Sequence, residues 1–211
     1  MSALVPALVA ALLTSGAAED EIGQIAKAES GLTGTATNEK SVLALAGSRA
    51  KHEKGGLVLR LDDGKSVRLG DGCKPSEEEP CPSYLLAAYL PSRGVFVVEK
   101  NEVESYDFLL IEMANGKQHT VDGPPHYSPD GKRFVTCRVD EMNGGGTRVW
   151  RVAPGRYGQE WADDRMSVCD NWKDKDTFAL GVYAAEPSGK PRAMTLTHKG
   201  DAWQLHEGKT P

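Results

Sequence analysis

The chain has too few basic residues for a surface that binds phosphates. Among its 211 residues, 25 Lys and Arg stand against 30 Asp and Glu, and the formal net charge is -5 at pH 7. Binding to nucleic acid or to an anionic membrane surface requires clustered basic side chains. We therefore expect no nucleic acid among the partners of this protein.

The chain also lacks the residue patterns that hold metal ions. No Cys-x-x-Cys occurs, and no two of the five histidines share the spacing of metal ligands. The acidic stretches 163–164 and 174–176 lack the regular alternation of carboxylates found in calcium loops. The sequence therefore predicts no metal site and no cofactor.

No catalytic signature stands out. A histidine, a serine and an aspartate lie close together in residues 126–130. The nucleophile elbow of a hydrolase, however, needs Gly-x-Ser-x-Gly between a strand and a helix. Here a proline presets φ and a glycine is free to adopt φ > 0, which predicts a structural turn formed by Ser128, Pro129, Asp130 and Gly131. We expect no catalytic residue, and the sequence leans against an enzyme.

The apolar run at the N-terminus, residues 4–13, is too short to cross a bilayer. Small residues follow it up to Ala18, and Glu19 and Asp20 come next. This pattern is typical of a secretory signal cleaved after Ala18, although no Lys or Arg precedes the apolar run. An ordinary N-terminal helix and an uncleaved anchor are the alternatives. We predict a signal peptide over residues 1–18, a periplasmic or secreted location, and no membrane insertion after cleavage.

Four cysteines are consistent with export, because disulfides persist in oxidising compartments. Cys73 and Cys81 bracket a short acidic loop, and Cys137 and Cys169 remain as the second pair. Four cysteines allow three connectivities, and this pairing follows from proximity and from the repeat described below. The sequence predicts two disulfides.

Helical signals are confined to the start of the mature chain. Residues 19–40 are small, polar and acidic, and they predict a flexible or helical leader that glycines interrupt. From residue 41 on, short β-type runs take over, separated by Gly, Pro, Asn and Asp. We expect residues 41–211 to form a single domain.

Four segments of this domain share one pattern, an apolar strand, a glycine turn and a second strand. The turns are Asp63-Gly64, Asn115-Gly116, Pro154-Gly155 and Lys199-Gly200, of which Asp-Gly and Asn-Gly are strong hairpin signals. Three of the hairpins follow another pair of apolar runs, and the starts at Tyr84, His126 and Ser167 are 42 and 41 residues apart. A period near forty residues with four strands is typical of propeller blades.

One repeat is clearer than the others. Residues 125–135, Pro-His-Tyr-Ser-Pro-Asp-Gly-Lys-Arg-Phe-Val, and residues 147–152, Thr-Arg-Val-Trp-Arg-Val, resemble the WD-like β-propeller repeat of the periplasmic propeller of the Tol-Pal system and of many peptidases. The resemblance implies that both segments lie on the inner strands of a blade, with residues 128–131 as the turn. The second and fourth units depart from the motif, with Pro-Ser-Arg-Gly at 91–94 and Asn-Trp-Lys-Asp at 171–174.

The predicted fold class is therefore all-β, with about four propeller-blade-like antiparallel sheets and a short N-terminal helix. Four units are few for a closed propeller, so the sheets form either a small ring or an open array whose edges need protection. A two-sheet β-sandwich is the alternative way to bury the same faces.

Binding residues are predicted from exposure and charge. Trp161 lies in a mostly polar run, so its ring is a candidate contact for a partner or a sugar. The acidic loop between the first two cysteines and the histidine beside the turn are further candidates, namely Glu77, Glu78, Glu79 and His126.

These observations favour an exported, non-catalytic binding or scaffold module of the cell envelope, with an envelope protein or a glycan as its partner. One alternative is a periplasmic hydrolase whose carboxylates come from different blades. Another is an inhibitor of a secreted enzyme that inserts the acidic loop into its target.

Overall fold

The computed structural model describes residues 36–70, 74, 81–103, 105–140, 145–184 and 189–208. The expected signal peptide, the leader up to residue 35, Cys73 and the candidate residues Glu77, Glu78 and Glu79 lie outside the described residues.

The first two sheets are antiparallel meanders. Sheet I contains β1 (Ala50–Glu53), β2 (Gly56–Arg60) and β3 (Ser66–Leu69), in that order. Sheet II contains β4 (Ser83–Leu90), β5 (Val95–Asn101), β6 (Tyr106–Glu112) and β7 (Gln118–Val121), with the short 3-10 helix η2 (Pro91–Arg93) between its first two strands.

The last two sheets repeat the plan of sheet II. Sheet III contains β8 (His126–Tyr127), β9 (Arg133–Arg138), β10 (Gly146–Ala153) and β11 (Arg156–Asp163). Sheet IV contains β12 (Ser167–Asp174), β13 (Thr177–Val182), β14 (Arg192–Lys199) and β15 (Ala202–Glu207). The predicted all-β fold of four blade-like antiparallel sheets is confirmed, and the strands do not form the alternative two-sheet sandwich.

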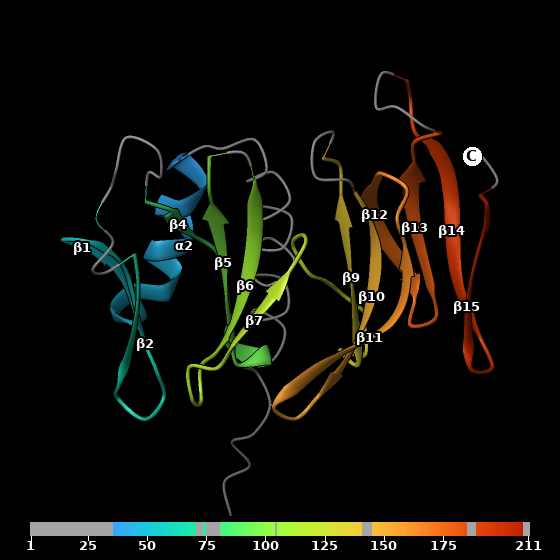
Figure 1. Cartoon of the computed structure of the whole chain (residues 1–211). Coiled ribbons are helices and arrows are strands. Elements are labelled where there is room, and N and C mark those ends of the chain that lie inside the picture. The colour runs from blue at the N-terminus through green and yellow to red at the C-terminus, as the bar shows by residue number, and fades with distance from the viewer. Residues whose placement is uncertain are drawn as a thin grey trace, which may run out of the picture.

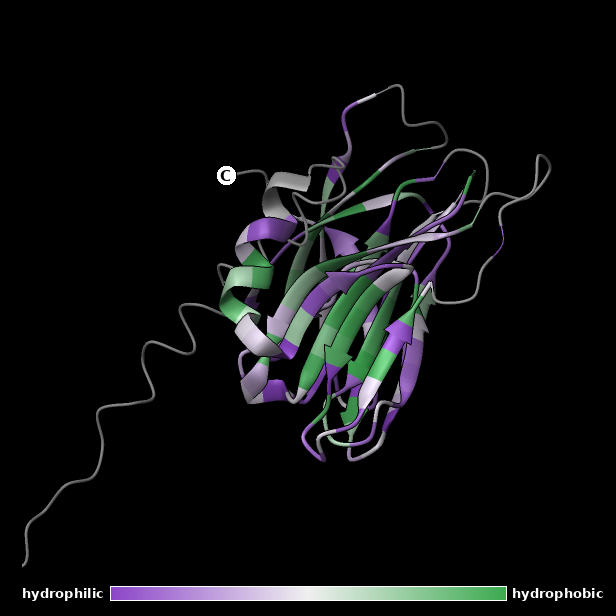
Figure 2. Cartoon of the chain, turned by 90° about the vertical axis from the view of Figure 1, so that its left-hand side faces the viewer, coloured by the Kyte–Doolittle hydropathy of each residue, from purple (hydrophilic) through white to green (hydrophobic). Residues whose placement is uncertain are grey.

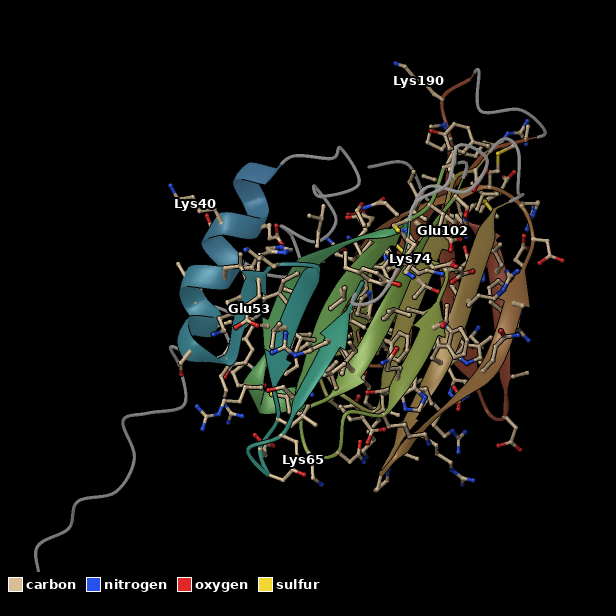
Figure 3. All side chains as sticks on the ribbon, turned by 60° about the vertical axis from the view of Figure 1, so that its left-hand side comes forward. Lys40, Glu53, Lys65, Lys74, Glu102 and Lys190 are labelled. Carbon is tan, nitrogen blue, oxygen red and sulfur yellow. A yellow bond between two sulfur atoms is a disulfide. The ribbon has the colours of Figure 1, made fainter. Side chains whose placement is uncertain are left out.

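The four predicted glycine hairpins all form. Gly64, Gly116, Gly155 and Gly200 have φ between 60° and 83°, the left-handed region that glycine adopts without strain. Each lies between the last two strands of its sheet. These turns gather at the lower end of the sheets in Figure 1, and Lys65, which follows Gly64, is labelled at that end in Figure 3.

The four sheets stand in an open row. Figure 1 shows sheet I at one end, sheet IV at the other and sheets II and III between them. One apolar cluster joins sheets I and II, a second joins II and III, and a third joins III and IV. Among the described residues, no such cluster joins sheet IV to sheet I. The array is therefore open rather than a closed ring.

The apolar clusters on the two faces of a sheet are built from alternate residues of its strands. Phe96, Phe108, Phe134 and Phe178 are fully buried on the central strands of sheets II, III and IV. Figure 2 shows the apolar residues concentrated on these central strands. A β-strand presents alternate residues to opposite faces, so each sheet between two neighbours is apolar on both faces.

The N-terminal helix differs from the sequence interpretation, which placed the first strands from Ser41 on. Helix α2 (Ala36–Ala46) runs across that position and is followed by the 3-10 helix η1 (Gly47–Arg49). Val42 and Ala46, one turn apart, are buried in the cluster between sheets I and II. An apolar stripe of two residues is too narrow to stand out as a periodic pattern.

Helix α2 also protects the edge of sheet II. The carboxylate of Glu39 accepts hydrogen bonds from the backbone N–H of Leu86 on β4, at 2.8 Å, and from Nε2 of His52, at 2.8 Å. An unpaired edge strand would otherwise invite another chain to pair with it. Lys40, the next residue, points away from the sheets (Figure 3).

A disulfide connects the last two sheets. Cys137 on β9 and Cys169 on β12 are bonded, with their Cα atoms 5.4 Å apart. This is one of the two predicted pairs, and it is confirmed. Cys81 is also disulfide-bonded, and its predicted partner lies outside the described residues. Within the described ranges, no helix is long and apolar enough to cross a membrane.

Candidate binding site

A cavity of about 450 Å³ opens where sheets II, III and IV meet. It lies near the start of β6, the end of β9 and the start of β12, at the upper end of the sheets in Figure 1. The described residues that border it are Tyr106, Pro124, His126, Cys137, Val139, Ser167, Val168 and Cys169. The cavity thus draws its wall from three sheets and from the segment that connects two of them.

His126 places its imidazole in the cavity wall. Its side chain packs edge-on against Phe178, with ring centroids 5.7 Å apart. Burial lowers its pKa to about 4, because charging the ring would leave a cation in apolar surroundings. His126 is therefore neutral at pH 7 and acts as an amphipathic part of the wall.

The wall beside His126 is held rigidly. The disulfide between Cys137 and Cys169 lies in it, and the hydroxyls of Thr147 and Ser167 are hydrogen-bonded at 2.7 Å. Both hydroxyls are buried, so this bond replaces the water that they would otherwise bind. These contacts fix the start of β12 against sheet III.

Tyr106 also borders the cavity. The guanidinium of Arg138 lies over its ring, 5.0 Å from the centroid. Arg138 also donates to Asp107 at 3.2 Å and to Asp140 at 2.6 Å. Burial raises the pKa of the Tyr106 phenol, so the ring stays neutral at physiological pH.

The residues predicted as a turn lie at the other end of sheet III. Gly131 donates its N–H to the carbonyl of Ser128 at 2.8 Å and has φ of 67°. The Ser128 hydroxyl donates to the carboxylate of Asp130 at 2.8 Å. These contacts engage the hydroxyl and the carboxylate in the turn, at the end of the sheet remote from the cavity.

Trp161 does not border the cavity. It lies on β11 opposite Val149 and packs, half-buried, against the apolar cluster between sheets III and IV. Of the predicted binding residues that the structure describes, only His126 lies at the cavity. The acidic candidates Glu77, Glu78 and Glu79 lie outside the described residues.

Sequence reasoning missed most of the cavity wall. Tyr106, Val139 and Val168 carry no motif and were not singled out. The predicted cysteine pair was the one available signal, because it marks where β9 and β12 approach each other. Within the described part of the chain, no group of three or more His, Cys, Asp or Glu residues is arranged to hold a metal ion.

Comparison with known proteins shows a likeness at the level of solved structures alone. No family model and no curated protein matches it. Among solved structures it matches the crystal structure of TolB from Acinetobacter baumannii, with 16% sequence identity and a TM-score of 0.38. The match covers 70% of this chain and 36% of the TolB chain, so this chain spans only about a third of that protein. A likeness at this level carries no argument about function, and the propeller-like assignment rests on the four sheets themselves.

Proposed function

We propose that this protein is an exported, non-catalytic binding module of the cell envelope that receives apolar side chains of a partner protein in the cavity beside His126. The observation that carries the proposal is the cavity itself, about 450 Å³ and bordered mainly by apolar groups and a disulfide. Cavities of roughly 300–1,000 Å³ with an apolar lining and a few polar groups are the usual form of a ligand site.

Rigidity of the wall favours binding. The disulfide between sheets III and IV and the bond between Thr147 and Ser167 hold the cavity open before a partner arrives. A preformed site loses less conformational entropy on association than a mobile one. The wall is therefore suited to tight contact with a small apolar group.

The chemistry of the lining favours binding over hydrolysis. General acid–base catalysis needs positioned titratable groups that act together. His126 is neutral and buried, the hydroxyl of Ser167 is paired with Thr147, and no carboxylate is among the described residues that border the cavity. The alternative of a hydrolase receives no support at this site.

Disulfide bonding supports export. Cys137, Cys169 and Cys81 are all bonded, and such bonds are rare in reducing compartments. A chain expressed in a bacterial host should be recovered from the periplasm with residues 1–18 removed and with no free thiol, as intact mass before and after reduction would show. Recovery in the cytoplasm with reduced cysteines and residues 1–18 retained would contradict the export part of the proposal.

A capture experiment tests the binding part. The mature chain would be used to retrieve partners from envelope extract at moderate salt. Val168 borders the cavity and is 38% exposed, so Val168→Glu places a carboxylate at its mouth at little cost to folding. Leu45→Glu is the matched control, because Leu45 is an exposed apolar residue on α2, which lies beside sheets I and II.

We expect a stoichiometric partner that binds the wild type and Leu45→Glu and is lost with Val168→Glu. A partner retained equally by all three proteins would place the contact elsewhere. The absence of any partner under these conditions would contradict the proposed function.

A further inference from the structure

A second hollow, a groove of about 250 Å³, lies between sheets II and III. It is bordered by strands β6 and β7 on one side and by β10 and β11 on the other, through Asp107, Thr120, Val121, Asp122, Arg148, Trp150 and Gln159. None of these residues borders the cavity beside His126. The residues that border the groove include one aromatic side chain and several polar side chains.

The aromatic ring is held in one orientation. Trp150 stacks on Phe134, with ring centroids 5.9 Å apart and an angle of 16° between the planes. Its indole N–H donates to the hydroxyl of Thr136 at 3.1 Å. Trp150 therefore offers a fixed apolar surface whose own polar atom is already satisfied.

The charged groups at the groove are also held in place. Asp122 accepts a hydrogen bond from the Thr136 hydroxyl at 2.6 Å. Asp107 accepts from Arg138 at 3.2 Å. Arg148 donates to the carbonyl of Asp163 at 2.8 Å and to the carboxylate of Asp164 at 2.7 Å, and its Nε lies 3.8 Å from Asp122. A carboxylate has about four acceptor sites and a guanidinium has about five N–H donors, so each group keeps capacity for a ligand.

Two further polar side chains face no competing partner. Thr120 and Gln159 are exposed, and within the described part of the chain their side chains make no hydrogen bond. Gln159 is paired directly opposite Trp150 in the register of β10 and β11. The hydroxyl and the amide supply both donors and acceptors beside the ring.

We propose that this groove binds one pyranose ring of a glycan. A sugar ring has an apolar C–H face that suits the indole, and each of its hydroxyls both donates and accepts hydrogen bonds, which suits the mixed polar groups around it. A wholly apolar ligand would cover the remaining acceptor and donor sites of Asp107, Asp122 and Arg148 without forming hydrogen bonds to them. A polyanion would be repelled, because two carboxylates stand against one guanidinium among the described residues that border the groove and the net charge of the chain is -5.

The test is a titration of the whole chain with sugars, monitored through the indole N–H resonances in ¹H–¹⁵N NMR spectra. Glucose, galactose and N-acetylglucosamine are the probes, and Trp150→Phe assigns the Trp150 signal by its disappearance. We expect at least one sugar to shift the Trp150 signal saturably, with a dissociation constant in the millimolar range, while the Trp203 signal stays in place.

Two variants and one control tie the shift to the groove. Thr120→Val and Gln159→Ala remove exposed polar groups that the fold does not use, and each should weaken binding by about 2- to 10-fold. Gln204→Ala, an exposed glutamine of β15 outside the groove, should leave the affinity unchanged.

The inference is overturned if no sugar moves the Trp150 signal, or if Thr120→Val and Gln159→Ala bind as the wild type does. Val168→Glu separates it from the proposed function, because that change blocks the cavity and leaves the groove intact. Sugar binding that persists in Val168→Glu assigns the sugar to the groove, and sugar binding that this variant abolishes overturns the assignment.

Discussion

Trp172 donates its indole N–H to the backbone carbonyl of His126, with 2.8 Å between nitrogen and oxygen. The bond runs from β12 of sheet IV to β8, the two-residue edge strand of sheet III. It connects this edge strand to the neighbouring sheet, and it holds His126 in the wall of the cavity. A side chain of sheet IV is thus hydrogen-bonded to the backbone of sheet III.

Trp172→Phe should remove this bond while keeping an aromatic ring against Phe178, which lies 5.2 Å away. Because this hydrogen bond between sheets III and IV would be lost, we expect a loss of about 0.5–1.5 kcal/mol in the free energy of unfolding. Urea unfolding followed by circular dichroism measures this loss. An unchanged unfolding midpoint would mean that water replaces the indole without cost.

Protonation of His126 should destabilise the protein in mild acid. Its pKa is about 4 in the folded state, below the ordinary value of 6.5, so the unfolded chain takes up the proton first. The stability that the neutral ring contributes is complete above pH 6.5 and is lost as the pH falls towards 4. The loss amounts to about 3 kcal/mol over this window.

Urea unfolding of the wild type and of His126→Gln between pH 7 and pH 4 measures the effect. The wild type should lose more stability than the variant over this range, because glutamine does not titrate. Parallel pH profiles would show that His126 is not buried as a neutral ring.

Glu160 on β11 accepts hydrogen bonds from two donors of its own sheet III and from one donor of sheet IV, Trp203 on β15. It accepts hydrogen bonds from Arg133 at 2.7 Å, from Trp203 at 3.2 Å and from Arg151. Burial raises its pKa, but these bonds outweigh burial and hold the pKa below the ordinary 4.5. The stabilisation is therefore present above pH 4.5 and disappears as the pH falls through the lowered pKa.

Glu160→Gln should cost about 2–3 kcal/mol at pH 7, and the difference from the wild type should shrink below pH 4. The control is Glu207→Gln, whose carboxyl is exposed and lies 4.0 Å from Arg192. Its effect should be close to zero, as for most surface ion pairs. Equal effects of the two changes would contradict the role of Glu160 between the sheets.

The disulfide between Cys137 and Cys169 closes a sequence separation of 32 residues. Replacing both cysteines by serine should lower the free energy of unfolding by about 4 kcal/mol, because the unfolded chain gains freedom. Urea unfolding without reducing agent gives the value. The double variant should also bind the partner of the cavity more weakly, and unchanged stability would show that the packing of sheets III and IV alone holds them together.

Replacing Gly131 or Gly155 by alanine gives a matched pair of variants that tests the turns. Both have φ near 67°, where an L side chain costs about 1–2 kcal/mol. A Cβ at Gly155 meets nothing within 4 Å, whereas at Gly131 it would lie 1.7 Å from the guanidinium of Arg93, which lies over the ring of Tyr127. Gly131→Ala should therefore cost about 0.5–1 kcal/mol more than Gly155→Ala in urea unfolding. A smaller loss for Gly131→Ala would contradict the contact with Arg93.

Most of the fold could be predicted from the sequence because it is specified locally. A glycine turn such as Asn115-Gly116 needs only the φ freedom of one residue and two strands of matching pattern. All four hairpins follow from such signals and are present. The pairing of Cys137 with Cys169 was predicted from the repeat and from the proximity of the other two cysteines, and it is present as well. The short N-terminal helix was predicted, but its extension past residue 40 was not, because the buried face of α2 is short and its glutamate contacts β4, at Leu86, far along the chain.

The sequence by itself determined the strands, the turns and the number of sheets, since these depend on neighbours within a few residues. Only the tertiary structure decided that the row of sheets stays open and that Tyr106, His126 and Ser167 border one cavity. These residues belong to three different sheets, and no local pattern encodes how their strands approach. The packing of whole sheets against one another sets the distance between these residues, and this packing depends on apolar side chains spread along the entire domain.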